Sequence, residues 1–393
     1  MKTRQTVIAY ASRTAIGKMG GSLASTPAPR LGAALVEDAL KKLSLKGEAV
    51  DEIIMGQVLT AGVGQAPARQ TAIYGGLPSS VAATTLGKVC GSGMKAVMLA
   101  DQAIRVGDAS IIFAGGQENM SLAPHVLPNS RNGYRFGSFE VKDSMQMDGL
   151  WDPYNNVPMG NCGEICAKEY KFTREAQDEY AYQSYHKARK AVESGLFAEE
   201  IVTFPVQDRK GTKNFEIDEE PFSVDLDRIS TLRPAFSKDG TITAANASSI
   251  NDGASLLVLC SEEAAAAHNL QPIARIVAQA SFAQDPVKFT TAPIECIRKV
   301  LKKAELKASD IDLYEINEAF AVVSMAAIKD LELEPSRVNV SGGAVALGHP
   351  IGSSGARILV TLIHALKKRK EKRGLAAICI GGGEATAVIV EMV

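Results

Sequence analysis

The chain has 393 residues, of which 46% are hydrophobic and 22% charged, and its formal net charge is −1. This length allows more than one domain with a large core, and the balanced charge excludes an electrostatic nucleic-acid binder. No apolar stretch is long enough to cross a bilayer, and the first residues show no signal, transit or anchoring pattern. Six irregularly spaced cysteines indicate a reducing compartment rather than a disulfide framework. We therefore expect a cytoplasmic protein without a nucleic-acid or membrane partner.

Short apolar runs alternate with helical patterns along the first third of the chain. Strands are predicted at residues 7–14 and 52–59, and a helix with apolar residues at helical spacing is predicted at 28–43. A second helix follows residue 91 and stops at Gly107, before the strand "ASIIFAGGQE". Strands that alternate with helices predict an α/β fold built from βαβ units.

The two ends of the chain resemble each other. Residues 50–58 are similar to 311–319, and residues 90–118 are similar to 351–384. Both copies of the longer segment pass from a Gly/Ser turn through a helix to an apolar strand that ends in a "GG-x-E" motif. This repetition predicts a duplicated structure with two similar α/β halves.

We expect the first half to comprise residues 1–120 plus 245–270, and the second half residues 271–393. The intervening segment, 121–244, has a different composition, with many polar turns, the only Trp and a predicted helix pair around 173–195. We interpret it as an inserted lid (loop) domain. A substrate pocket is expected where the lid meets the halves.

Cys90 lies at the junction between a predicted extended segment and a predicted helix. The free N–H groups and the positive end of a helix favour a thiolate, so Cys90 is a candidate nucleophile. The alternative is that Cys90 is only a small buried hydrophobic residue.

The second half has other chemically capable residues at corresponding turns. They are His349, Cys379 with the three glycines that follow it, and Asn317. Each also has a purely structural explanation. His349 could be an ordinary hydrogen-bonded polar residue, and Cys379 could be a core residue. The three glycines could form only a tight turn, and Asn317 could cap the helix that follows it. Strand ends in an α/β structure converge on one face, which favours a shared site.

Five motifs together identify a resemblance to the thiolase family over the whole chain. They are "VCGSGMKA", "NASSINDGA", "EINEAFA", "VNVSGGAVALGHPIGSSGAR" and "CIGGGEA". The resemblance implies the thiolase fold, two duplicated halves in a five-layered α-β-α-β-α arrangement with the inserted loop domain. It also implies a homo-oligomer, with a tetramer favoured over a dimer.

The resemblance assigns catalytic roles. Cys90 is the nucleophile that carries the acyl group, His349 takes its proton, and Cys379 is the second acid/base. His349 and a water held by Asn317 form one oxyanion hole, and the N–H groups of Cys90 and Gly381 form the other. No metal or redox cofactor is required, and the spacing of Cys162 and Cys166 lacks the second Cys/His pair of a metal site.

The implied substrates are coenzyme A thioesters, and the implied reaction is the reversible Claisen condensation of two acetyl-CoA molecules. Ser248 is expected to bind the pantetheine arm. The tunnel residues are expected to be Leu150, Met159, Phe236, Ala244, Ala319 and Phe320, for which core packing is the alternative.

Two features depart from the short-chain pattern. Pro158 precedes Met159 and Gly160, as in long-chain degradative thiolases, and residues 219–225 contain no arginine for the adenine end of CoA. The alternative function is therefore a broader 3-ketoacyl-CoA thiolase of β-oxidation. An inactive acyl-CoA or lipid carrier is a distant alternative, since it predicts loss of Cys90, His349 or Cys379.

A further pattern resembles the potassium site of some acetoacetyl-CoA thiolases. The expected potassium ligands are Tyr185, Ala244, Ala245, Ala247 and Val345. Tyr185 as an ordinary helix aromatic is the alternative.

Overall fold

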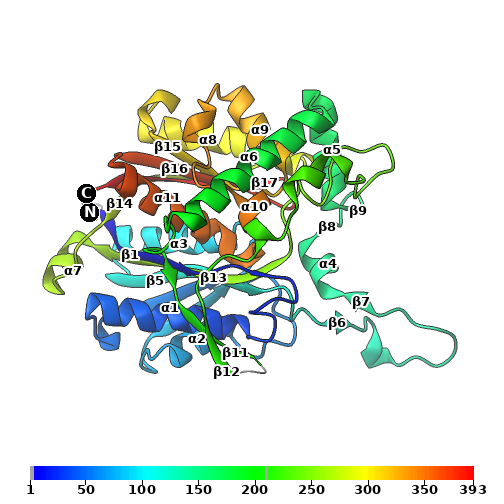
Figure 1. Ribbon diagram of the computed structural model, residues 1–393. Helices are drawn as coiled ribbons and strands as arrows, with labels where there is room; N and C mark the ends of the chain where they lie inside the picture. Colours follow the sequence, from blue (N-terminus) through cyan, green and yellow to red (C-terminus); the bar gives the residue numbers. More distant parts are fainter. Residues whose placement is uncertain (1–3, 209–210) are drawn as a thin grey trace.

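Helices and β-sheets alternate in layers through the molecule, as Figure 1 shows for the computed structural model, which describes residues 4–208 and 211–393. Helices α1 (Ala28–Leu43) and α2 (Pro67–Tyr74) cover the sheet of the first half from outside, and α8 (Ala292–Ala304) and α9 (Ala321–Asp330) cover the sheet of the second half. Two more helices, α3 and α11, lie between the sheets. This arrangement confirms the predicted five-layered α/β fold.

The two halves repeat the same strand order. In the first half the order is β1-β13-β5-β3-β4, and in the second half it is β14-β17-β16-β15. The strand directions also match between the halves. The pairs β3–β5 and β15–β16 are parallel. The pairs β1–β13 and β13–β5 in the first half, and β14–β17 and β17–β16 in the second, are antiparallel. A short pairing of Val7 and Ile8 with β14 joins the two sheets. The sequence repeats thus correspond to equivalent elements of a duplicated structure.

The elements of the first half are β1 (Thr6–Thr14), α1 (Ala28–Leu43), β3 (Glu52–Gly56), α2 (Pro67–Tyr74), β4 (Ala82–Leu86), α3 (Ser92–Val106), β5 (Ile111–Asn119) and β13 (Asn251–Ser261). Helix α1 buries Leu31, Leu35 and Val36 against the sheet, as its apolar spacing predicts. Helix α3 ends where Gly107 adopts a φ of 91°, a left-handed conformation that glycine tolerates.

The elements of the second half are β14 (Ala274–Ala283), α8 (Ala292–Ala304), β15 (Leu313–Ile316), α9 (Ala321–Asp330), α10 (Ala344–Leu347), α11 (Ile351–Arg369), β16 (Arg373–Ile380) and β17 (Glu384–Met392). Helix α11 is buried over most of its length because it packs between both sheets. A short helix, α7 (Glu262–Ala267), precedes β14.

The central helices approach the strand ends so closely that only glycine fits between them. A Cβ atom on Gly116 of β5 would lie 2.0 Å from the carbonyl oxygen of Gly352 in α11. A Cβ atom on Gly56 of β3 would lie 2.5 Å from the backbone of Ser92, the first residue of α3. The starts of both helices are therefore fixed by backbone contact with the first half's sheet.

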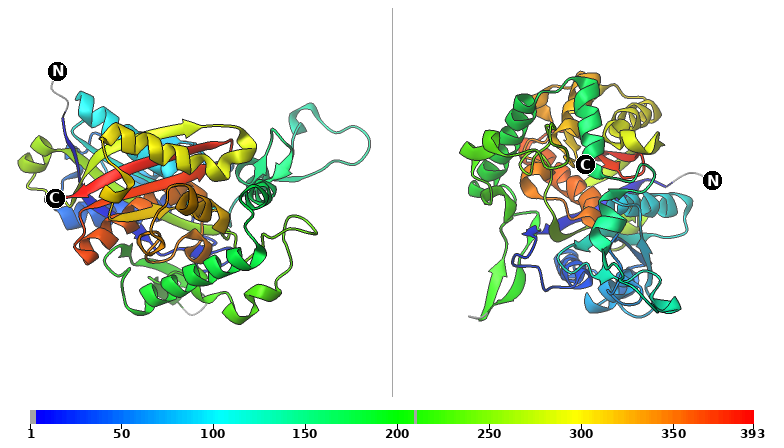
Figure 2. Two further views of the ribbon diagram at one scale, coloured as in Figure 1. Left: turned by 90° about the horizontal axis from the view of Figure 1, so that it is seen from above. Right: turned by 90° about the vertical axis from the view of Figure 1, so that its right-hand side faces the viewer.

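Residues 121–244 add elements that the second half lacks. A projecting arm carries β6 (His125–Val126) and β7 (Lys142–Asp143), seen at the right of Figure 1 and in the left view of Figure 2. The remaining elements are α4 (Ser144–Gly149), β8 (Trp151–Asp152), β9 (Val157–Pro158), α5 (Met159–Tyr170), α6 (Arg174–Glu193), β10 (Ile201–Val202), β11 (Phe204–Asp208) and β12 (Gly211–Phe215). The helix pair expected around residues 173–195 is a single helix there, α6, and the helix that precedes it, α5, lies outside that range.

This inserted segment is anchored in the first half rather than loosely attached. Strand β10 pairs with β1, and the guanidinium of Arg13 lies 2.6 Å from Glu200 and 2.7 Å from Asp218. All three side chains are buried, and the fork of Arg13 satisfies both carboxylates. Removal of Arg13 would leave two buried carboxylates without this cationic partner.

Candidate active site

The turn before α3 holds Cys90 in a strained backbone. Val89, directly before it, has a φ of 44°, which is rare for a β-branched residue. The hydroxyl of Ser92 stabilises the turn, because it accepts from the N–H of Lys88 at 2.8 Å and donates to the carbonyl of Val89 at 2.7 Å. This turn places the Cys90 thiol at the start of the helix.

The Cys90 thiol is protonated at rest, contrary to the expectation that the helix end favours a thiolate. Burial raises its pKa to about 11, and the negative charge of Glu118 acts in the same direction. The N–H groups of Gly381 and of Cys90 itself oppose this increase, but they do not outweigh the loss of solvent. Cys90 therefore needs a base before it can attack.

His349 is suited to be that base. It is 5% exposed, and burial, followed by the positive charge of Arg357, lowers its pKa to about 3, so its ring is neutral. Its Nδ1 lies 2.6 Å from the hydroxyl of Ser354, which donates its own proton to the carbonyl of Pro350 at 3.0 Å. Ser354 must then accept from Nδ1–H, which leaves the lone pair on Nε2. Nε2 has no hydrogen-bond partner among the described residues.

Ser354 is a functional residue that the sequence analysis missed. Its place in "HPIGSSG", five residues after His349, is an ambiguous signal because Ser353 lies beside it. Ser353 instead lies 2.9 Å from the hydroxyl of Ser255 on β13. The folded structure, and not the sequence, shows which of the two serines contacts His349.

Cys379 lies at the end of β16 and is fully buried. Burial raises its pKa well above that of an ordinary thiol, and ionisation of Cys90 would raise it further, which indicates that the two thiols lie near each other. After Cys379 the chain turns through Gly382 and Gly383, which have φ values of 91° and 86°. The positive φ values of Gly382 and Gly383 explain why glycine is needed in this tight turn.

Asn317 follows β15 and is 1% exposed. The alternative that it caps α9 is wrong, because that helix starts after Phe320 without a side-chain cap. Both polar atoms of the Asn317 amide lack a hydrogen-bond partner among the described residues. A buried amide without a partner costs about 1–3 kcal/mol, so its environment favours a bound water or substrate atom.

A cavity of about 260 Å³ joins the two halves and the lid. Cys90, His349 and Gly381 line it, whereas Cys379 and Asn317 are not among the described residues of its wall. Most of the expected CoA residues line it as well, namely Leu150, Met159, Phe236, Ser248, Ala319 and Phe320. Ala244 does not: it is exposed, and Ala247 lies on the wall instead.

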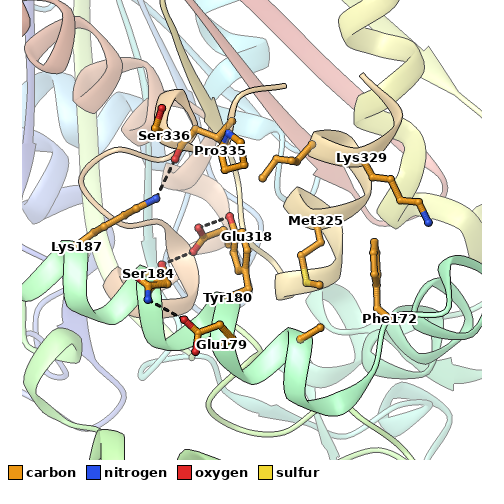
Figure 3. A pocket seen from close by; sticks show the side chains of 14 residues that line it. Phe172, Glu179, Tyr180, Ser184, Lys187, Glu318, Met325, Lys329, Pro335 and Ser336 are labelled. Atoms are coloured by element: carbon orange, nitrogen blue, oxygen red, sulfur yellow. Dashed lines mark hydrogen bonds between the residues drawn. The ribbon is translucent and has the colours of Figure 1, made fainter. Parts of the chain in front are cut away.

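A larger cavity, of about 540 Å³, lies between α6, α9 and residues 335–338 (Figure 3). Glu318 on its wall is 1% exposed and accepts hydrogen bonds from Tyr180 at 2.9 Å and Ser184 at 2.8 Å. This cavity contains neither a thiol nor a histidine among its lining residues. The chemistry therefore places the active site in the smaller cavity.

The residues expected to bind potassium lie near one another. Tyr185, Ala245 and Val345 belong to the same buried cluster, and the carboxylates of Glu220 and Glu318 contribute to the raised pKa of Tyr185, after burial. No described residue donates a hydrogen bond to the main-chain oxygens of Ala244, Ala245 or Ala247. Free carbonyl oxygens in a negative field fit a monovalent cation.

No cluster of three His, Cys, Asp or Glu side chains suited to a metal occurs among residues 4–208 and 211–393. Cys162 and Cys166 lie one helical turn apart in α5, and both are buried in the core. Within the same residues, no helix combines the length and apolarity that a membrane crossing requires.

The sequence models of known families match nearly all of the chain. The model of the "Thiolase, N-terminal domain" matches residues 6–263, and that of the "Thiolase, C-terminal domain" matches residues 270–392. The chain therefore belongs to the thiolase family of acyl-transferring enzymes.

Individual relatives are similar over their full length. The chain is 53% identical to an acetyl-CoA acetyltransferase of Cupriavidus necator over 387 residues, which cover 98% of both chains. It is 49% identical to acetyl-CoA acetyltransferase 1 of Arabidopsis thaliana, over 100% of this chain and 95% of the relative. A crystal structure of the Bacillus anthracis acetyl-CoA acetyltransferase matches with a TM-score of 0.97 at 40% identity, over 100% of both chains. A thiolase of Ascaris suum in complex with coenzyme A matches with a TM-score of 0.94 at 44% identity, over 99% of this chain and 100% of that one.

Proposed function

We propose that the protein is an acetyl-CoA C-acetyltransferase, which condenses two acetyl-CoA molecules to acetoacetyl-CoA and free CoA and also catalyses the reverse thiolysis. The observation that carries this proposal is a cavity in which a protonated thiol, the free Nε2 of a neutral histidine and a backbone N–H donor meet. The names of the full-length relatives support the same activity.

In the first step the enzyme becomes acylated. His349 Nε2 takes the Cys90 proton as the sulfur attacks the thioester carbonyl, and the same proton then goes to the departing CoA sulfur. The N–H groups of Cys90 and Gly381 stabilise the negative oxygen of the tetrahedral intermediate. Because Cys90 is a thiol at rest, the proton transfer and the attack are coupled.

In the second step Cys379 moves the proton of the substrate carbon. Its thiolate, which is the minor form because burial raises the pKa of Cys379, takes an α proton from the second acetyl-CoA, and the resulting enolate attacks the acetyl group on Cys90. His349 and a water on Asn317 stabilise the enolate oxygen. The Cys90 thiolate then leaves and recovers the proton from Cys379. In the reverse direction, the raised pKa of Cys379 keeps its proton available for the departing carbanion.

We expect a short acyl range, because Met159, Leu150 and Phe236 close on a cavity of about 260 Å³. Thiolysis assays with 3-ketoacyl-CoA substrates of increasing length should give the highest kcat/KM for acetoacetyl-CoA. Faster cleavage of a long substrate would favour the broader 3-ketoacyl-CoA thiolase of β-oxidation. In that case Pro158, which occurs at this position in long-chain degradative thiolases, would be the better indicator of the preferred acyl length.

Potassium is proposed as an activating ion in the same assay. Tyr185 and the carbonyl groups of Ala244, Ala245, Ala247 and Val345 would bind it, and the bound ion would stabilise the loop that carries Ser248. Acetoacetyl-CoA thiolysis at fixed ionic strength should be faster in potassium than in sodium or a bulky organic cation, since sodium is smaller and more strongly hydrated. Equal rates in all three would exclude a functional ion site.

A homo-oligomer is also proposed, with a tetramer favoured over a dimer. The arm of residues 121–150 projects from the layered body, and Phe136 on it is fully exposed. Exposed apolar side chains on a projecting segment favour an interface with another copy. A cytoplasmic location is proposed because all six cysteines are free thiols.

A further inference from the structure

The two "GG-x-E" motifs of the duplicated halves end in Glu118 and Glu384, and neither glutamate has a role in the reaction described above. Each carboxylate crosses from its own half to the turn that precedes the central helix of the other half. Glu118, in the first half, reaches the start of α11, which follows His349. Glu384, in the second half, reaches the turn before α3, which carries Cys90.

Glu118 is fully buried at the end of β5. One of its oxygens accepts from the N–H of Gly352 at 2.9 Å and of Val58 at 3.0 Å, and the other accepts from Leu59 at 3.2 Å. Gly352 is the second residue of α11, where the helix dipole favours a negative charge. Glu118 thus fixes the chain three residues after His349 to the end of β3.

Glu384 forms an ion pair with Lys88, two residues before Cys90. Both side chains are partly exposed. Glu384 comes directly after the turn that contains Gly381, whose N–H faces the Cys90 sulfur. The pair therefore connects the two turns that supply the two N–H donors of one oxyanion hole.

We propose that Glu118 and Glu384 are reciprocal positioning residues, each of which holds the catalytic turn of the other half. The proposal rests on the proposed function, because it concerns the placement of Cys90 relative to His349 and Gly381. The donors come from different halves, and a small displacement between donors and nucleophile lowers the rate strongly. The strained φ of Val89 is a separate reason why the Cys90 turn needs support.

The ordinary interpretation of Lys88–Glu384 is a surface ion pair, which contributes about 0–1 kcal/mol to stability and nothing to catalysis. A test must therefore separate rate from stability. Glu384→Gln keeps the shape of the side chain and removes its charge. It is preferable to a change of Lys88, because Lys95 also lies in the field of Glu384 and could replace Lys88.

The full-length E384Q variant should acylate Cys90 about tenfold more slowly than the wild type, as measured by rapid acid quench and mass spectrometry after mixing with acetyl-CoA. Its thermal unfolding midpoint and its KM for acetyl-CoA should stay unchanged. The matched control is Glu199→Gln, which removes the exposed ion pair with Lys367 at the far end of α11. The charge-reversed double variant Lys88→Glu with Glu384→Lys should recover most of the rate.

Glu118→Gln should have a larger effect, about a hundredfold, because the amide keeps one accepting oxygen and its NH2 group would face at least one of the three backbone N–H donors. If this variant does not fold, E384Q and the double variant decide the question. An E384Q enzyme that acylates at the wild-type rate, or a double variant that acylates no faster than E384Q, would overturn the proposal. A wild-type enzyme that acquires no acetyl group on Cys90 would instead overturn the proposed function.

Discussion

Replacement of Cys90 by alanine should abolish covalent acetylation and lower turnover by about four orders of magnitude or more. The alanine cannot form a thioester, while the cavity and its CoA-binding wall remain. Acid quench after incubation with acetyl-CoA, followed by peptide mapping, should locate the acetyl group on Cys90 of the wild type. The variant should carry none.

A matched control for this substitution is Cys296→Ala, which also removes a buried thiol but lies in α8, in the outer helix layer. It should keep acylation. An acetyl group found on another residue of the wild type would contradict the assignment of Cys90. Because burial raises the pKa of Cys90 to about 11, its alkylation by iodoacetamide should also accelerate as pH rises through 8 and 9.

Cys379→Ser should separate the two half-reactions. The serine hydroxyl has a far higher pKa than a thiol and is a poor base, so condensation should slow by about two orders of magnitude or more. Acetylation of Cys90 should persist, because it depends on His349. Burst acylation and steady-state formation of acetoacetyl-CoA, measured on the same sample, give both rates.

The control for Cys379→Ser is Cys260→Ser, a fully buried thiol on β13. It tests whether a hydroxyl in an apolar strand lowers activity through stability alone. A Cys379→Ser variant that condenses acetyl-CoA at the wild-type rate would show that Cys379 only packs in the core. Equal losses in both variants would do the same.

The duplication in the sequence predicted two similar α/β halves, and the resemblance to the thiolase family implied their five-layered arrangement. The helical spacing of α1, α3 and α11 and the repeated Gly/Ser turns follow from local backbone preferences. The repeat predicts that the two halves are alike, but the strand order within each half was not predicted, because it depends on pairing between distant segments. The anchoring of the lid through Arg13, Glu200 and Asp218 was not predicted, because partners about 200 residues apart leave no local pattern.

Three of the predicted catalytic residues, Cys90, His349 and Gly381, line one cavity, whereas the protonation state of Cys90 was not predicted. A helix start predicts a stabilised thiolate at Cys90, yet burial has the larger effect on its pKa, and burial is a property of the whole fold. The role of Ser354 was missed for the same reason, because the direction of its hydroxyl depends on Pro350 and His349 together. The position of Ala244 was also missed, since loop backbones have no periodicity that indicates which side faces a cavity.

The glycine contacts beneath α3 and α11 have a consequence for how the protein can change over evolutionary time. Gly56 and Gly116 admit no side chain, so the segments that carry Cys90 and His349 tolerate few substitutions. Leu150, Met159 and Phe236, which close the substrate cavity, belong to the inserted segment instead. New acyl preferences are therefore most accessible through substitutions in residues 121–244, while close backbone contacts restrict substitution around the reactive centre.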